Sequence, residues 1–229
     1  MHSMKNNTQK VVTIDGPSGV GKSTISRRVA ASLSFTYLDT GAMYRAVGYK
    51  LQKSNVDLAD ESAVQHCLDM ISLQLLPAAT ENDEVSVILD EEDISLAIRS
   101  PEMSMMASKV SAIPAVREKL TLMQQQIGEK GSIVAEGRDT GTVVFPAASW
   151  KFYLDADPKE RMRRRAAQLR LAGKEVDEDE LLQMIIQRDH DDQSRTIAPL
   201  CKADDAVTVD TSRLTIDEVV QVMLGRIEV

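Results

Sequence analysis

Five short runs rich in apolar and β-branched residues recur along the chain, and each ends in an acidic residue. They cover residues 10–15, 36–39, 132–136, 149–155 and 206–210, and four of them end in aspartate and one in glutamate. Their apolar residues are nearly continuous, which is typical of parallel strands covered on both faces. Helical patterns separate the runs. The pattern predicts βαβ units and an α/β fold with a five-stranded parallel sheet flanked by helices.

Residues 70–100 interrupt this alternation with shorter segments. Residues 84–89 have the composition of a strand, residues 90–93 that of a turn, and residues 94–95 that of a second short pairing segment. Residues 73–76 add a third candidate strand. We therefore expect a small antiparallel insertion between the second and third core strands.

Helical periodicity occupies much of the rest of the chain. Asp157, Pro158 and Glu160 form a capping-box pattern that predicts the start of an arginine-rich helix. The expected helices cover 24–33, 101–128 with a break near Pro114, 158–173, 175–195 and 215–227.

Composition limits the classes of protein to which the chain can belong. With 229 residues, 43% of them hydrophobic, it suits one domain with a sizeable core, and residues 1–8 are a polar stretch expected to be a flexible tail. No apolar run approaches the roughly 18 residues of a membrane helix. A net charge of −8 argues against general nucleic-acid binding. Cys67 and Cys201 are expected to be buried free thiols in a reducing cytoplasm.

A glycine-rich loop follows the first predicted strand and precedes a predicted helix. It matches the phosphate-binding pattern G-x-x-x-x-G-K-[ST], and its residues are Gly16, Pro17, Ser18, Gly19, Val20, Gly21, Lys22, Ser23 and the adjacent Thr24. Such loops direct backbone N–H groups at phosphate oxygens. Lys22 is expected to reach the β- and γ-phosphates of ATP, and Ser23 to ligate Mg²⁺. Asp15 is a candidate outer-shell ligand of that metal.

Arginines are placed to form a second anion site. Arg45 and Arg138 follow the ends of two predicted strands. Arg188, Asp192 and Arg195 have a spacing that puts them on one face of a helix. These two groups of arginines lie outside the glycine loop and indicate that the phosphoryl acceptor is itself an anion. A phosphate monoester is such an acceptor, and it needs positioning and charge neutralisation rather than a base. The arginines at 161–165 predict a mobile lid over the transferring phosphate.

Two other functions stay open at this point. Asp39 and Asp139 are carboxylates that could receive a proton from an alcohol, so a small-molecule kinase of the shikimate type is one alternative. The other is a nucleotide-gated binding protein without catalytic activity. The arginine-rich helix disfavours the second alternative, because a protein that only retains ATP gains nothing from stabilising a transition state.

Four segments together carry a resemblance that covers about residues 11–220. The segments DGPSGVGKST, LDTGAMYRA, AEGRDTGTVVFP and RDHDDQSRTIAPL, in this order and spacing, closely resemble bacterial cytidylate kinases of the P-loop nucleoside monophosphate kinase family. The resemblance implies transfer of the ATP γ-phosphoryl group to CMP or dCMP with Mg²⁺, by a cytoplasmic monomer. It also implies one kinase domain, residues 9–229, with a core (9–39, 129–157 and 203–229), an acceptor-binding region (40–128) and a lid with the following helix (158–202).

The same resemblance implies roles for individual residues. Arg45, Arg138 and Arg188 would hold the CMP phosphate, and Asp192 and Arg195 the ribose. Cytosine would be bound by Ser108, Arg117 and Asp139, with Asp39 and Thr40 close by. Lys22, Arg138 and Arg188 would be catalytic, and Arg163 and Arg164 are the predicted lid arginines.

The predicted cytosine contacts imply a base preference. Asp139 can accept from the N4 amino group, while Ser108 and Arg117 donate to N3 and O2. Uracil has a carbonyl oxygen in place of the N4 amino group and a hydrogen on N3, so both of these contacts would meet a like partner. An unmade buried hydrogen bond costs about 1–3 kcal/mol. CMP is therefore expected to be preferred over UMP by at least about tenfold.

Overall fold

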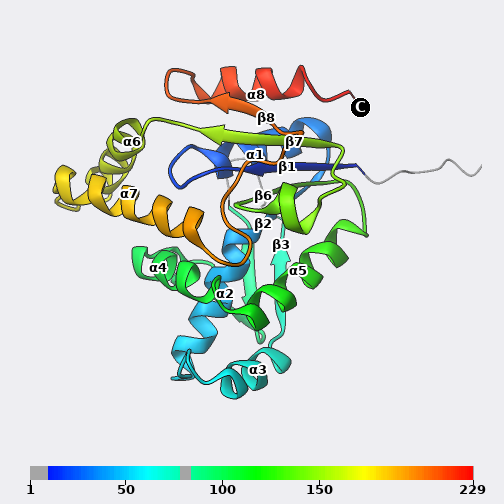
Figure 1. The fold of residues 1–229 in the computed structure, drawn as a ribbon, viewed down its shortest axis with the longest axis vertical. Coiled ribbons are helices and arrows are strands. Elements are labelled where there is room, and N and C mark those ends of the chain that lie inside the picture. The colour runs from blue at the N-terminus through cyan, green and yellow to red at the C-terminus, as the bar shows by residue number, and fades with distance from the viewer. Residues whose placement is uncertain (1–9, 78–83, 229) are drawn as a thin grey trace, which may run out of the picture.

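The parallel sheet predicted from the sequence is present in full. A computed structural model describes residues 10–77 and 84–228, so the predicted tail at 1–8 lies outside the described residues. One five-stranded parallel sheet has the order β2-β6-β1-β7-β8 (Figure 1). Its strands are β1 Val11–Asp15, β2 Thr36–Asp39, β6 Ile133–Gly137, β7 Trp150–Asp155 and β8 Val207–Asp210. The α/β fold class is confirmed.

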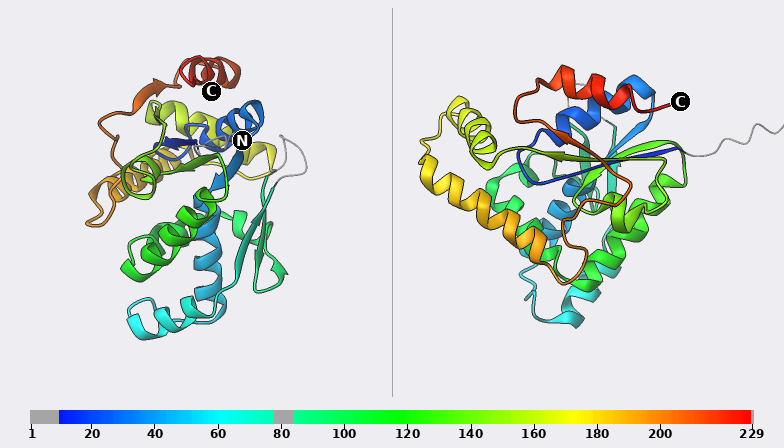
Figure 2. Two further views of the ribbon diagram at one scale, coloured as in Figure 1. Left: turned by 90° about the vertical axis from the view of Figure 1, so that its right-hand side faces the viewer. Right: turned by 45° about the horizontal axis from the view of Figure 1, so that its top comes forward.

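One face of this sheet packs against two helices that are far apart in the sequence. These are α1 (Lys22–Leu33) and α8 (Ile216–Leu224), which lie side by side, in blue and red, in the right-hand view of Figure 2. Val12 and Ile14 of the central strand point toward them and are fully buried, together with Phe152, Val219 and Met223. Because side chains alternate along a strand, Thr13 and Asp15 point to the opposite face.

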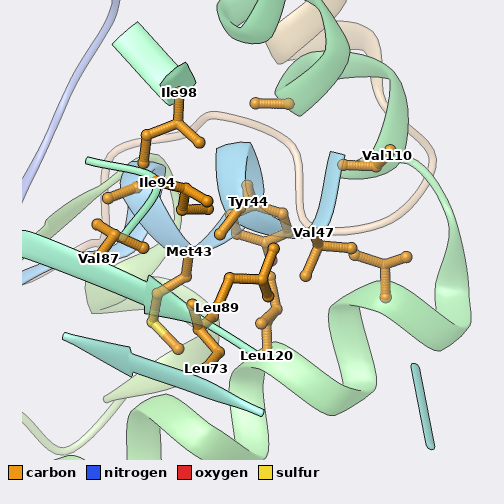
Figure 3. Close-up of a cluster of buried hydrophobic side chains, with 14 of the residues drawn as sticks. Met43, Tyr44, Val47, Leu73, Val87, Leu89, Ile94, Ile98, Val110 and Leu120 are labelled. Carbon is orange, nitrogen blue, oxygen red and sulfur yellow. The ribbon is translucent and has the colours of Figure 1, made fainter. Parts of the chain in front are cut away.

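The opposite side of the molecule carries a second hydrophobic cluster. It is built around α2 (Thr40–Lys53), whose N-terminus is capped by Asp39. Around α2 gather α3 (Glu61–Asp69), α4 (Pro101–Val110), α5 (Pro114–Gly128), the single 3₁₀ turn Ala97–Arg99 and the small sheet. Figure 3 shows Met43 and Val47 of α2 among Leu89 and Leu120 of this cluster. The break at Pro114 occurs as predicted. The exact limits of the core, acceptor-binding and lid regions stay a prediction.

The antiparallel insertion is present, but one of its strands differs from the prediction. It pairs β3 (Leu73–Leu76), β4 (Ser86–Leu89) and β5 (Glu92–Asp93) in that order. Asp90 and Glu91 have φ of 49° and 70°, so the chain reverses in two residues and pairs again at once. The expected four-residue turn at 90–93 and strand at 94–95 were therefore wrong. Asp90 and Glu91 adopt the left-handed conformation although neither is a glycine, which makes the turn shorter than predicted.

Two helices beyond the carboxyl ends of the strands form an antiparallel pair. They are α6 (Pro158–Leu171) and α7 (Glu178–Ser194), on the left of Figure 1 and in yellow and orange in the right-hand view of Figure 2. The Asp157 carboxylate caps α6 as predicted. Helix α7 begins at Glu178, three residues later than expected, because the Asp177 carboxylate accepts from the N–H groups of Asp179 and Glu180.

The two thiols are in different environments. Cys67 is buried in the second cluster, whereas Cys201 is exposed, and neither forms a disulfide. The expectation that both are buried was wrong for Cys201, because it lies in the irregular connection between α7 and β8. Within residues 10–77 and 84–228, no helix is long and apolar enough to cross a membrane.

Candidate active site

The glycine loop lies between β1 and α1, at the carboxyl edge of the central strand. Gly16, Gly19 and Gly21 have φ of 149°, 83° and 91°, values that side chains with a Cβ rarely adopt. A Cβ on Gly16 would lie 2.1 Å from the carbonyl oxygen of Leu154. Gly21 is the N-cap of α1 and supplies no side-chain cap. The first N–H groups of α1 are therefore available for an anion.

Lys22 is buried within this loop. Its Nζ donates to the carbonyl oxygens of Gly16 at 2.8 Å and Pro17 at 2.6 Å. Burial, and then the nearby positive charge of Arg138, lower the pKa of Lys22 well below its usual value. The side chains of Ser23 and Thr24 begin the exposed face of α1. These positions fit the predicted phosphate-binding roles of the loop.

Glu136, at the end of β6, lies beside the loop and was given no role in the sequence analysis. Tyr37 donates its hydroxyl hydrogen to Oε1 of Glu136. Oε2 is buried and has no hydrogen-bond donor among the residues that the structure describes. Burial, and then the charge of Asp39, raise the pKa of Glu136. The sequence signal that could have identified it was an acidic residue at the end of a predicted strand. The structure shows that this strand, β6, pairs directly with β1.

Asp39 and Thr40 hold the adjacent end of β2 in place. One oxygen of Asp39 accepts from the Ala42 N–H at 2.8 Å, and the other accepts from Nη2 of Arg45 at 3.1 Å. The Thr40 hydroxyl donates to the carbonyl oxygen of Glu136 at 2.7 Å. Asp39 thus orients Arg45 toward the space in front of the glycine loop.

Arg138 and Arg188 lie in one basic cluster with Arg45. Arg138 donates from Nε to Asp192 of α7 at 2.9 Å. Burial lowers the pKa of Arg188 to about 10, and the charges of Arg138 and Arg45 contribute in the same direction. The Nε atoms of Arg45 and Arg188 are buried and have no acceptor within the described ranges 10–77 and 84–228. Clustered guanidiniums with unmatched donors are suited to binding an anion.

A second group of polar side chains lies next to this basic cluster. Arg117 and Asp139 form a buried ion pair, and Arg117 also donates to the Ser111 carbonyl oxygen at 3.2 Å. Burial raises the pKa of Asp139, although the charge of Arg117 opposes that shift. The Arg117 guanidinium lies 5.7 Å from the centre of the Tyr44 ring.

Ser111 links the remaining predicted residues to this group. Its hydroxyl accepts from Nη1 of Arg195 at 2.7 Å and donates to the Ser108 carbonyl oxygen at 2.7 Å. Arg195 also contacts Asp192 at 3.5 Å. The structure thus brings Ser108, Arg117, Asp139, Asp192 and Arg195 together. Ser111 and Tyr44 were not predicted as site residues: Ser111 lies outside every quoted motif, whereas Tyr44 lies within LDTGAMYRA, directly before Arg45.

The arginines of α6 point in different directions. Arg163 is 71% exposed and contacts only Glu160 among the residues that the structure describes. Arg164 donates to the Thr211 carbonyl oxygen at 2.6 Å and to Glu160 at 3.1 Å. Arg165, which the prediction did not select, lines a cavity of about 210 Å³ together with Ser23, Tyr37, Asp39, Arg45 and Arg99. The roles of Arg163 and Arg164 stay a prediction, and the arginine of α6 that lines this cavity is Arg165.

Asp15 has a structural role that the sequence did not suggest. Its carboxylate accepts from the N–H and hydroxyl of Thr140 at 2.9 and 2.8 Å, and from the Gly141 N–H at 2.7 Å. These bonds hold the helical turn Thr140–Val144 that follows β6. Burial raises the pKa of Asp15 to about 6.

Comparison with known proteins assigns the chain to a family. The family model described as cytidylate kinase matches residues 12–229. The chain belongs to the cytidylate kinase family. The cytidylate kinase of Carboxydothermus hydrogenoformans is 45% identical over 93% of this chain and 95% of its own length, and that of Vibrio cholerae is 46% identical over 95% and 96%.

Two further similarities differ in kind, one of sequence and one of fold. The chain is 45% identical to 40% of a bifunctional pantoate ligase/cytidylate kinase of Synechococcus elongatus. A solved structure of an uncharacterized protein from Eubacterium ventriosum, at 11% identity, covers 95% of this chain and 97% of its own with a TM-score of 0.51, and shows similarity of fold alone. As a member of this family, the chain is a kinase.

Proposed function

We propose that this protein transfers the γ-phosphoryl group of ATP to CMP or dCMP, giving ADP and CDP or dCDP. The observation that carries this proposal is the basic cluster of Arg45, Arg138 and Arg188 beside Lys22. Two of its buried guanidinium nitrogens have no acceptor in the described part of the chain. A phosphate monoester supplies the missing acceptors and the negative charge.

In this proposal the glycine loop binds the donor. The N–H groups at the start of α1 bind phosphate oxygens, and Lys22 neutralises charge on the β- and γ-phosphates. Lys22 is already fixed by its bonds to Gly16 and Pro17, so little reorganisation is needed when charge develops in the transition state.

The residues beside the loop fit a magnesium ion. Mg²⁺ prefers oxygen ligands, and Ser23 and Glu136 supply a hydroxyl and a carboxylate from neighbouring elements. The buried Oε2 of Glu136 has no donor among the described residues, as expected of an atom available to a cation. When bound, Mg²⁺ neutralises charge on the β- and γ-phosphates of ATP.

The acceptor half needs no general base. The phosphate of CMP is largely dianionic at neutral pH and can attack without losing a proton. Asp39, the base required by the shikimate-type alternative, is occupied by the Ala42 N–H and by Arg45. This favours a phosphate acceptor over an alcohol.

The second polar group binds the nucleoside in this proposal. Asp192 and Arg195 bind the ribose, and Asp139, Arg117 and Ser108 bind cytosine. The Arg117–Asp139 ion pair holds the Asp139 carboxylate in a buried site, where a mismatched base is penalised most.

We further propose that the enzyme acts as a monomer in the cytoplasm, where its two free thiols would remain reduced.

A substrate screen tests the proposal. The purified protein is incubated with ATP and Mg²⁺ and with CMP, dCMP, UMP, AMP or shikimate in turn, and ADP is measured against a control that lacks acceptor. We expect fast ADP formation with CMP or dCMP. No ADP above the control with either would overturn the proposal, and turnover of shikimate alone would favour the alcohol acceptor. Nucleotide binding without any turnover would favour the binding protein.

A matched pair of lysine variants tests the donor site. Lys22→Ala should lower kcat at least about 100-fold, because it removes a buried charge at the phosphates. Lys174→Ala, at an exposed position after α6, should leave kcat unchanged. Circular dichroism should show folded protein in both cases, and equal activities would place the donor elsewhere.

A further inference from the structure

Arg161 is the most highly connected arginine of α6, and its guanidinium donates to acceptors of the protein itself. Its side chain is 3% exposed. Nε donates to the Ala156 carbonyl oxygen at 3.0 Å, and Nη1 donates to the carbonyl oxygen of Ser18, in the glycine loop, at 3.1 Å. Nη1 and Nη2 also reach the two carboxylate oxygens of Asp189 on α7, at 3.0 and 2.5 Å. One guanidinium thus joins the loop, the start of α6 and the middle of α7.

The bond to Ser18 affects the orientation of the loop. In a trans peptide group the C=O and the following N–H point in opposite directions. Because Arg161 holds the Ser18 carbonyl, the N–H of Gly19 is directed away from Arg161. Gly19 has φ of 83°, and a Cβ there would lie 3.4 Å from the Arg161 Cβ, so the loop is packed closely on this side chain.

The bond to Asp189 connects the loop to the acceptor site. Asp189 follows Arg188 directly and precedes Asp192 by less than one helical turn. Within the segment RDHDDQSR, the proposed function uses Arg188, Asp192 and Arg195 and gives Asp189 no ligand. Asp189 instead binds Arg161. A bidentate arginine–carboxylate pair is geometrically demanding, so a shift of the loop is transmitted to α7.

We propose that Arg161 is a positioning residue that, through Asp189, couples the donor loop to the acceptor clamp on α7. The inference rests on the proposed function, because it assumes that the loop binds ATP and that Arg188 and Asp192 bind CMP. Binding at one site then changes the affinity of the other, and by linkage the effect is reciprocal.

The chain contains a matched control for this pair. Arg170 and Glu178 form a second ion pair of 2.7 Å between the same two helices, at the end distant from the loop, and both are about half exposed. Glu178→Gln removes one negative charge from the α6–α7 pair, as Asp189→Asn does, and it leaves the contacts of Arg161 intact.

Binding measurements test the coupling directly. The dissociation constant of CMP is measured by calorimetry with and without a non-hydrolysable ATP analogue and Mg²⁺, for wild type, Asp189→Asn, Asp189→Glu, Arg161→Lys and Glu178→Gln. We expect the analogue to change the wild-type CMP constant at least about fivefold. Asp189→Asn and Arg161→Lys should reduce the change to less than about twofold, Asp189→Glu should recover part of it, and Glu178→Gln should retain it.

The outcomes separate coupling from a purely structural role. If Asp189→Asn melts at a lower temperature but keeps the full wild-type coupling, or if wild type shows no coupling, the inference is overturned. Should Arg161→Lys fail to fold, Asp189→Asn and Asp189→Glu still decide the question. Turnover of CMP by the wild type is measured separately. A failed coupling test with normal CMP turnover overturns the inference and leaves the proposed function intact, whereas absent CMP turnover overturns the function and with it the premise of the inference.

Discussion

Arg138 and Asp192, 54 residues apart in the sequence, are joined by a hydrogen bond of 2.9 Å between Nε and Oδ2. Arg138 follows β6 directly and Asp192 lies on α7, so the bond connects the edge of the sheet to the helix beyond it. Although burial opposes it, Arg138 lowers the pKa of Asp192 below its usual value. A carboxylate that stays charged in this position attracts the clustered arginines and offsets the repulsion among their positive charges.

The first prediction concerns Arg188, the member of that cluster with a buried donor nitrogen that lacks an acceptor. Arg188→Ala should lower kcat/KM for CMP at least about 100-fold, because the acceptor phosphate loses a charged donor. The melting temperature should not fall, since the change also removes repulsion among half-buried guanidiniums. Steady-state kinetics and thermal unfolding check the two parts. Gln187→Ala, one residue earlier on the same helix, is the control, and a large loss of stability in Arg188→Ala would indicate a structural role.

The second prediction concerns the choice of base. Asp139→Ala should narrow the ratio of kcat/KM for CMP over UMP, because the acceptor for the N4 amino group is lost. It should also leave Arg117 buried without its partner and reduce the free energy of unfolding by about 3–5 kcal/mol. Competition assays and urea unfolding measure these effects. Asp191→Ala, at an exposed position, should change neither, and an unchanged CMP/UMP ratio in Asp139→Ala would place base selection on other residues.

The third prediction concerns pH and stability. Burial raises the pKa of Asp15 from 3.8 to about 6, so the folded protein binds this proton more tightly than the unfolded chain. The contribution of this group to stability is fully present below pH 3.8 and is lost as the pH rises through 6. The free energy of unfolding of wild type, minus that of Asp15→Asn, should therefore fall by about 2 kcal/mol between pH 4 and pH 7. Urea unfolding at several pH values provides the measurement, and a difference that stays constant or grows with pH would contradict it.

The fourth prediction compares two arginines of α6. Arg165 lines the cavity that contains Ser23 and Arg45, while Arg163 is largely exposed. Arg165→Ala should lower kcat about 100-fold, because a guanidinium at this position can neutralise the transferring phosphoryl group. Arg163→Ala should keep kcat within about twofold, since an exposed ion pair contributes little. Single-turnover kinetics with both variants decide between them. A large loss of kcat in Arg163→Ala together with a small loss in Arg165→Ala would restore Arg163 as the lid arginine.

Much of the fold follows from local patterns in the sequence. The central strands β1 and β6 are short runs buried on both faces, so their apolar composition was visible without knowledge of their neighbours. The helix starts at Asp157 and Pro114 were equally local, because a cap or a proline acts within one turn. The antiparallel hairpin was predicted, but its turn was placed at 90–93 instead of at Asp90 and Glu91, because neither residue type by itself indicates a left-handed conformation.

Side-chain contacts between residues far apart in the chain could not be predicted from the sequence. Nothing in the local pattern distinguishes Arg165 from Arg163, because only the packing of α6 against the core decides which side faces the cavity. Nor does it reveal that Asp189 binds Arg161, or that Ser111 receives Arg195. Such contacts depend on how separate helices dock, and docking is set by the whole core.

The sequence by itself determined the glycine loop, the order of the strands along the chain and the residue types at the site, because these depend on neighbouring residues. The tertiary structure decided which of those residues meet. It placed Glu136 beside the loop and brought Arg45, Arg138 and Arg188 into one half-buried cluster. The physical reason is that like charges gather only where a folded core holds them, and the energy that holds them comes from apolar packing elsewhere in the molecule.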